Sequence, residues 1–144
     1  MMRNLKFIAI AFFSASLIGI ASCKKEDERT TSEKLRAKWK LESYVFHRHE
    51  NGVDSNWNSV MDDRAVYWDI RPDNKIYRMI DSLVMFRNDY TLLNDTTLLL
   101  KYNDTDEETF RIRNLTDTAL HLYIKTLYQN NPANYIERNI SFTK

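Results

Sequence analysis

The sequence has few of the residues that build tight or reactive loops. Among its 144 residues there are two glycines, two prolines and one cysteine. Gly19 lies in an apolar N-terminal stretch, so Gly52 is the only glycine in the rest of the chain. Glycine-rich phosphate loops, dinucleotide-binding turns and nucleophile elbows need several glycines at fixed spacing, because the backbone must bend sharply or approach a ligand closely. The composition therefore excludes these sites.

An excess of charge of one sign is also missing. The chain has 21 Lys and Arg residues and 20 Asp and Glu residues, for a formal net charge of +1. A nucleic-acid binder needs clustered cations to neutralise phosphates, so we expect no nucleic-acid partner. No pattern places a nucleophile beside a base, or two carboxylates together in an apolar setting. The sequence therefore predicts a protein that is not an enzyme and needs no cofactor.

The first 22 residues have the layout of an export signal. Arg3 and Lys6 precede an apolar run from Phe7 to Ile20, and two small residues then lead to Cys23. This run is shorter than the roughly 20 residues that a membrane-spanning helix needs, which favours a signal peptide over a permanent anchor. We therefore assign residues 1–22 to a signal peptide.

The end of this segment, Ile20-Ala21-Ser22-Cys23, resembles the lipobox of bacterial lipoproteins. A single unpaired thiol is a liability in an oxidising compartment unless it is used, which favours lipidation of Cys23. The alternative to a lipoprotein signal is an ordinary cleaved signal peptide that is followed by an incidental cysteine. The resemblance implies cleavage before Cys23, a diacylglycerol on its sulfur and an acyl chain such as palmitate on its amino group. Several acyl chains hold a protein firmly on a membrane. We expect attachment to the outer membrane, with the protein facing the periplasm or the cell surface.

Residues 23–34 are predicted to be a lipidated tether. Between Lys24 and Lys34 the residues are charged or hydroxylic, with no apolar side chain to bury, which is typical of a solvated spacer. The acidic cluster Lys25-Glu26-Asp27-Glu28 is also similar to the surface-export signal of Bacteroidota lipoproteins. Both interpretations stay open. Thr30 and Glu33 have the spacing of a capping box, which predicts a short helix over Thr31–Ala37.

Residues 35–144 are predicted to form one all-β domain. Apolar and polar residues alternate with a period of two, and Asn and Asp supply the turns. Short connections between successive strands favour an antiparallel meander, either a sandwich or, as we predict, an eight-stranded up-and-down barrel. The expected strands are Trp39–Glu50, Ala65–Arg71, Lys75–Asp81, Leu83–Leu93, Thr96–Tyr102, Glu108–Asn114, Thr118–Thr126 and Tyr135–Thr143, and Asn51–Asn58 is expected to be a loop.

The start of this domain resembles a known family. The segment Leu35-Arg36-Ala37-Lys38-Trp39-Lys40-Leu41 is similar to the opening motif of lipocalin-like domains, with Ala37 where that family has glycine. The lipidated tether and the Asp-Thr hairpins that follow also resemble small lipocalin-like lipoproteins of Bacteroidota. This resemblance implies a lipocalin-like barrel that binds a small apolar or amphipathic ligand. The alternative is a filled barrel that serves as a non-catalytic interaction module of an envelope complex, with an unknown protein partner.

Four aromatic residues are the candidate ligand-binding residues. Trp57 stands in the longest expected loop, which in lipocalin-like barrels passes over the open mouth, and it either plugs the mouth or presents a binding surface. Trp68 lies on an expected inward face with Val66 and Ile70. Tyr128 and Tyr135 flank the late loop and could line the same mouth.

Arg138 is expected to point inward, because Ile136, Ile140 and Phe142 alternate with it on the last strand. An unpaired guanidinium in the core would be costly. Lipocalin-like barrels lay such an arginine across the tryptophan of the first strand, so the resemblance implies that Arg138 stacks on Trp39 and closes one end of the barrel.

Two polar clusters resemble metal sites only in part. His47 and His49 share one face of a strand, but a third ligand is missing, so solvated histidines are favoured. Asp104, Asp106 and Glu108 alternate as at the start of a calcium loop, but the later ligands of that loop are absent, which favours a solvated acidic hairpin. We therefore predict no metal.

Overall fold

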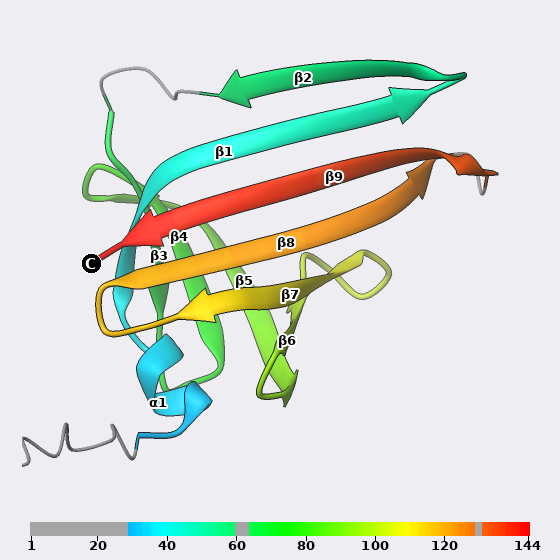
Figure 1. The fold of residues 1–144 in the computed structure, drawn as a ribbon. Coiled ribbons are helices and arrows are strands. Elements are labelled where there is room, and N and C mark those ends of the chain that lie inside the picture. The colour runs from blue at the N-terminus through cyan, green and yellow to red at the C-terminus, as the bar shows by residue number, and fades with distance from the viewer. Residues whose placement is uncertain (1–28, 60–63, 129–130) are drawn as a thin grey trace, which may run out of the picture.

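The structure is a computed structural model in which residues 29–59, 64–128 and 131–144 are described. The signal peptide, Cys23 and the first half of the tether lie outside these residues. The described residues form one short helix and nine antiparallel strands (Figure 1). Their bounds are α1 Thr31–Leu35, β1 Lys38–Glu50, β2 Val53–Ser59, β3 Val66–Ile70, β4 Lys75–Ile80, β5 Leu83–Asn94, β6 Thr97–Lys101, β7 Glu107–Leu115, β8 Ala119–Tyr128 and β9 Asn131–Thr143.

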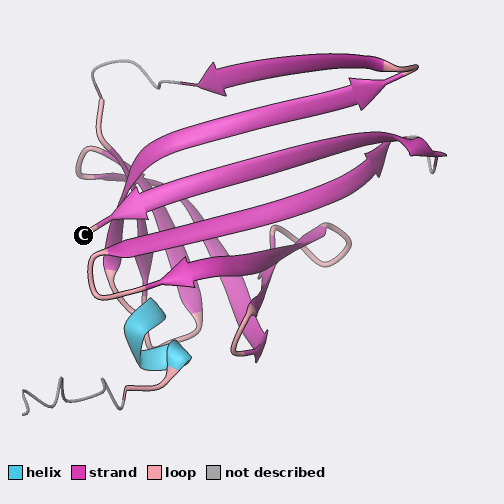
Figure 2. Ribbon diagram, viewed as in Figure 1, coloured by secondary structure: helices cyan, strands magenta, loops and turns pink. Residues whose placement is uncertain are grey.

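Eight of these strands form a closed barrel. The hydrogen-bonded order runs β1-β3-β4-β5-β6-β7-β8-β9, and β9 pairs back onto β1 to close the cylinder. Each strand is antiparallel to its neighbours, as Figure 2 shows for the meander of strands and tight turns. The prediction of an all-β, eight-stranded antiparallel up-and-down barrel with a short N-terminal helix is confirmed.

Strand β1 has one edge that pairs with two different strands. One edge pairs with β9 from Lys40 to His49, while the other edge pairs with β3 only at Lys38–Lys40 and with β2 from Tyr44 onward. Beyond this fork, β2, β1, β9 and β8 continue past the barrel as a ribbon of four strands (Figure 1).

The prediction that Asn51–Asn58 is a loop is wrong, because β2 occupies most of it. Asn51 and Gly52 both have positive φ, 53° and 78°, and connect the paired residues Glu50 and Val53. A two-residue turn with both residues in the left-handed region matches the twist of a hairpin, and Asn-Gly is the pair that adopts it most readily. The polar sequence of β2 is explained by its position outside the barrel, where it need not alternate.

Helix α1 and the first residues of β1 close one end of the barrel. The predicted capping box is present, with the Thr30 side chain accepting from the Glu33 amide and the Glu33 carboxylate accepting from the Thr30 amide. The helix ends at Leu35, two residues before the predicted end. Leu35 and Trp39 are both 0% exposed, and the Trp39 indole donates to the Leu35 carbonyl (2.8 Å). We call this the closed end.

Apolar side chains that point into the barrel form the core, which also contains Leu35, Trp39, Ile76, Tyr90, Leu98 and Leu100. Further core residues come from β3, β7, β8 and β9. The buried members are Trp68, Ile70, Phe110, Ile112, Leu120, Leu122, Ile124, Ile140 and Phe142. Val66 and Ile136 are only half-buried, because both lie on the side of the barrel away from α1. Of the residues that the structure describes, none forms a helix long and apolar enough to cross a membrane.

Candidate functional site

The inward-facing side chains change from apolar to polar along the barrel. At the closed end and the middle, inward positions are apolar, such as Ile76 of β4, Leu100 of β6 and Phe110 of β7. Two residues farther from α1, the next inward position is polar on β4, β5, β7 and β9 and directly after the end of β6. These polar positions are Arg78, Asn88, Tyr102, Glu108 and Arg138. We call the end that contains them the open end.

Glu108 and Arg138 form an ion pair inside the barrel across β8. Both guanidinium nitrogens of Arg138 bond to the Glu108 carboxylate, one at 3.2 Å, and the side chains are only 18% and 21% exposed. Burial lowers the pKa of Arg138, but the bonded charge of Glu108 outweighs this effect, so the pKa of Arg138 is raised overall. The prediction that Glu108 belongs to a solvated acidic hairpin is therefore wrong.

Tyr102 adds a hydrogen bond to this ion pair. Its hydroxyl donates to Glu108 Oε2 at 2.6 Å. Burial, followed by this bond to a carboxylate, raises the pKa of Tyr102 well above its ordinary value. Tyr102 therefore stays a neutral donor, and Glu108 has two hydrogen-bonding partners.

Arg78 has a different environment from Arg138. Its Nε donates to Asn88 Oδ1 (3.0 Å), and its guanidinium lies 4.6 Å from the centre of the Phe86 ring and 5.2 Å from that of Tyr102. Burial lowers the pKa of Arg78, and the interactions with Tyr102 and Glu108 compensate only in part. Arg78 is thus a half-buried cation that is held by an amide and two rings.

An apolar cavity of about 240 Å³ lies beside Arg78. Leu41 and Tyr44 of β1 line it at the fork, where β1 leaves β3, and Trp68 and Ile140 line it from inside the barrel. Among the described residues that line it, Arg78 is the only charged one.

The cavity opens at the β4–β5 hairpin. Met85 and Phe86 line it and are 46% and 57% exposed. Solvent or a ligand can therefore enter from this side of the open end.

The structure brings only one of the four predicted ligand-binding residues to this cavity. Trp68 lines it, whereas Trp57 lies on β2, 51% exposed and edge-on to Phe46 (5.4 Å between ring centres). Tyr128 lies under the guanidinium of Arg48 (4.8 Å), near the far end of the ribbon. Tyr135 stacks on His49 on the opposite face of the sheet. The predicted common mouth of Trp57, Tyr128 and Tyr135 is not formed.

The predicted stacking of Arg138 on Trp39 is also wrong, although β1 and β9 are adjacent as expected. The register places Arg138 opposite Phe46, seven residues along β1 from Trp39. Arg138 therefore pairs with Glu108 at the open end. The cation over the Trp39 ring is Lys144, whose Nζ lies 4.8 Å from the ring centre.

Sequence reasoning missed Arg78 and Glu108, although a signal for both was present. Arg78 alternates with Ile76 and Ile80, and Glu108 alternates with Phe110 and Ile112. A charged residue in phase with an apolar face points toward the core, as the pattern of the last strand predicted for Arg138.

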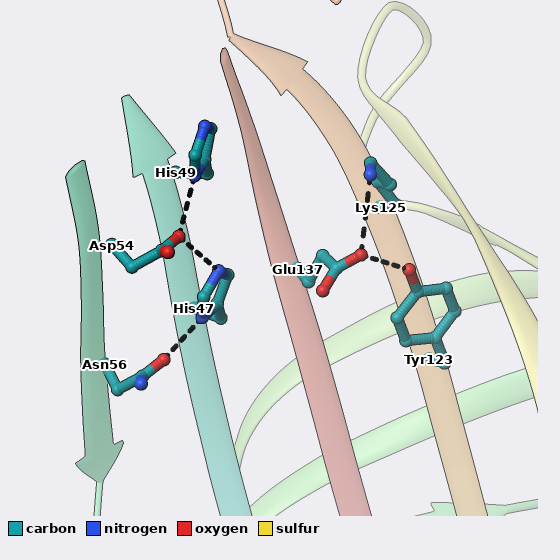
Figure 3. A network of polar contacts seen from close by, with 7 residues as sticks. All are labelled: His47, His49, Asp54, Asn56, Tyr123, Lys125 and Glu137. Carbon is teal, nitrogen blue, oxygen red and sulfur yellow. Dashed lines mark hydrogen bonds and ion pairs between the residues drawn. The ribbon is translucent and has the colours of Figure 1, made fainter. Parts of the chain in front are cut away.

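The outer face of the ribbon carries a separate polar network (Figure 3). His49 Nδ1 lies 2.7 Å and His47 Nε2 3.1 Å from the same oxygen of Asp54, which joins β1 to β2. On the neighbouring strands, Glu137 accepts from Tyr123 (2.7 Å) and pairs with Lys125 (3.6 Å). The contacts with the two histidines lower the pKa of Asp54, mainly through the hydrogen bond from His49.

This network ties strands together and does not form a metal centre. Within residues 29–59, 64–128 and 131–144, no group of three His, Cys, Asp or Glu side chains is arranged to hold a metal ion. His49 is hydrogen-bonded to Asp54 and His47 to Asn56, so each imidazole has a partner without a metal.

Comparison with known proteins adds nothing to this geometry. No family model matches the chain, and no curated protein and no solved structure is similar to it.

Proposed function

We propose that the protein is a lipoprotein of the Bacteroidota type, anchored to the outer membrane through lipid on Cys23. Its lipocalin-like barrel binds a small apolar or amphipathic ligand at the open end. The observation that carries the proposal is the apolar cavity beside Trp68, which opens to solvent at Met85 and Phe86. Concave apolar sites with a few polar groups are typical of small-molecule binding.

The size of the cavity limits the ligand. Its volume of about 240 Å³ lies below the roughly 300–1,000 Å³ of pockets for drug-sized molecules. An apolar cavity of about 150 Å³ already accommodates benzene. The inserted part of the ligand is therefore about the size of one or two rings or a short acyl chain.

A neutral fluorescent probe tests binding at the cavity. We expect phenylnaphthylamine to bind the wild-type protein with enhanced emission, and Val66→Phe to weaken this binding at least about tenfold, because Val66 lines the cavity and the larger side chain fills part of it. Val53→Phe is the matched control, since Val53 is 63% exposed on β2. Equal binding by wild type and Val66→Phe, or no binding by the wild type, contradicts the proposed function.

The anchor is tested separately. We expect Cys23→Ser to leave the barrel folded and to move the protein from the membrane fraction to the soluble fraction, because the sulfur that carries the diacylglycerol is gone. Recovery of Cys23→Ser in salt-washed membranes contradicts lipidation at this residue.

One observation favours a second function, that of an interaction module in an envelope complex. Leu83, Val84, Met85 and Phe86 form a continuous stretch of exposed apolar residues at the start of β5, with Leu83 at 66%. Such patches often mark contacts with another protein. Native mass spectrometry of the protein purified from its own envelope distinguishes the two functions, because it detects either a retained small molecule or a bound protein.

A further inference from the structure

We infer that the ligand of the barrel is a monoanionic amphiphile whose charged group binds to Arg78. This inference rests on the proposed function, since it specifies the chemistry of a ligand in the same cavity. It follows from the different partners of the two arginines inside the barrel and from the position of Arg78 in the cavity wall.

The two arginines are unequal because only one has a carboxylate partner. Arg138 is bonded to Glu108 through both terminal nitrogens. Arg78 forms one hydrogen bond, from Nε to Asn88, and no ion pair with the residues that the structure describes. Among the described residues of this inner layer, two guanidiniums and one carboxylate leave one positive charge uncompensated.

The free donors of Arg78 suit an anionic group. A guanidinium has five N–H donors, and Arg78 uses only Nε, so both terminal amino groups are left for a ligand. Two parallel hydrogen bonds from these groups match the oxygens of a carboxylate or sulfonate. The rings of Phe86 and Tyr102, at 4.6 and 5.2 Å, hold the guanidinium in place. The site is therefore organised before a ligand arrives.

The surroundings define the rest of the ligand. Arg78 is the charged residue of a cavity whose other lining is almost entirely apolar, so an anion bound there places its apolar part against Trp68 and Ile140. A cationic ligand would face Arg78, and a second negative charge would face Glu108. A membrane lipid with two acyl chains exceeds 240 Å³, which favours a small free amphiphile. Burial lowers the pKa of Arg78 because it disfavours the charged form. A bound anion would offset this cost, which also favours an anionic ligand.

Two probes with one skeleton test this inference. Anilinonaphthalenesulfonate and phenylnaphthylamine differ only by a sulfonate, so the ratio of their dissociation constants isolates the contribution of the negative charge. For Arg78→Gln we expect at least about a tenfold loss of affinity for the sulfonate, as for a charge-assisted hydrogen bond. Affinity for the neutral probe should change less than about twofold. Arg78→Lys should retain part of the lost affinity, since it keeps the charge without the planar fork.

Arg87→Gln is the matched control, because it removes one positive charge from an exposed residue of the neighbouring strand β5. Circular dichroism melts establish that each variant is folded before binding is compared. If Arg78→Gln and Arg87→Gln weaken the sulfonate equally, or if Arg78→Gln weakens both probes equally, the inference is overturned while ligand binding stands. If neither probe binds the wild type, the proposed function fails and the inference fails with it.

Discussion

The closed and open ends of the barrel are built from the same strands but are stabilised in different ways. At the closed end, α1 covers the interior, and Leu35 and Trp39 are completely buried with one hydrogen bond between them. At the open end, the same strands carry Arg78, Glu108 and Arg138 on their inner faces. On β4, β7 and β9 the change takes only two residues along the strand.

The two ends therefore have different roles: the closed end stabilises the fold, and under the proposed function the open end binds the ligand. Apolar burial at the closed end stabilises the fold at about 25 cal/mol per Å² without selecting a ligand. Charges inside the open end require partners, since an unpaired buried charge is costly. A barrel with one such charge uncompensated is therefore less stable than a fully apolar barrel, and under the proposed function this charge selects anionic ligands.

The largest expected effect is on the closed end. Trp39→Ala removes a completely buried indole and leaves the Leu35 carbonyl without its donor, so we expect a loss of about 3–5 kcal/mol in the free energy of unfolding. Urea denaturation measures it. Trp57→Ala is the control, with an expected loss of about 1 kcal/mol or less, because Trp57 is half-exposed and contacts Phe46 edge-on. Similar losses in the two variants would contradict the assignment of the core to the closed end.

The next effect concerns the ion pair of the open end. Glu108→Gln leaves two guanidiniums inside the barrel without a carboxylate. We expect a loss of about 2–3 kcal/mol, somewhat below the roughly 3–5 of a fully buried pair, because Arg138 and Glu108 are 18% and 21% exposed. Combining it with Arg138→Met should recover part of this loss, as denaturation of the double variant would show. Additive losses would mean that the two residues do not act as a pair.

A smaller effect is expected at the turn of the ribbon. Gly52 has φ of 78° and open space where a Cβ would lie, so Gly52→Ala introduces backbone strain and no clash. We expect a loss of about 1 kcal/mol, measured by thermal denaturation. Asn51→Gly in the same turn is the control and should not destabilise, because its φ of 53° suits glycine. If Gly52→Ala does not change the stability, the turn relaxes to accommodate alanine and the predicted backbone strain is absent.

The smallest effect is a pH dependence of the ribbon. The hydrogen bond from His49 lowers the pKa of Asp54 in the folded protein, so the unfolded chain binds a proton at Asp54 more readily. The contribution of Asp54 to stability is therefore complete above about pH 4 and is lost as the pH falls through the lowered pKa. Titration of the Asp54 carboxylate by NMR checks this direction, and His49→Ala should return its pKa toward the ordinary value. An unchanged pKa in that variant would contradict the assigned cause.

The sequence by itself determined the barrel and its short N-terminal helix. Apolar residues recur with a period of two on each strand, and this pattern does not depend on which strands are neighbours, so the strands and most of the core could be predicted. The capping box at Thr30 and Glu33 is equally local. The inward orientation of Arg138 followed from the same periodicity.

Only the tertiary structure decided the open end. Glu108 and Arg138 are separated by 30 residues, and their pairing depends on the register of β7, β8 and β9, which no local pattern encodes. The resemblance to lipocalin-like domains therefore led to the wrong partner for Arg138. The polar strand β2 forms because β1 extends past β3 and offers a free edge, and the cavity lies at this fork. Contacts between strands that are distant in the sequence create the site, so the pairing of its charged residues and the position of the cavity became evident only in the folded chain.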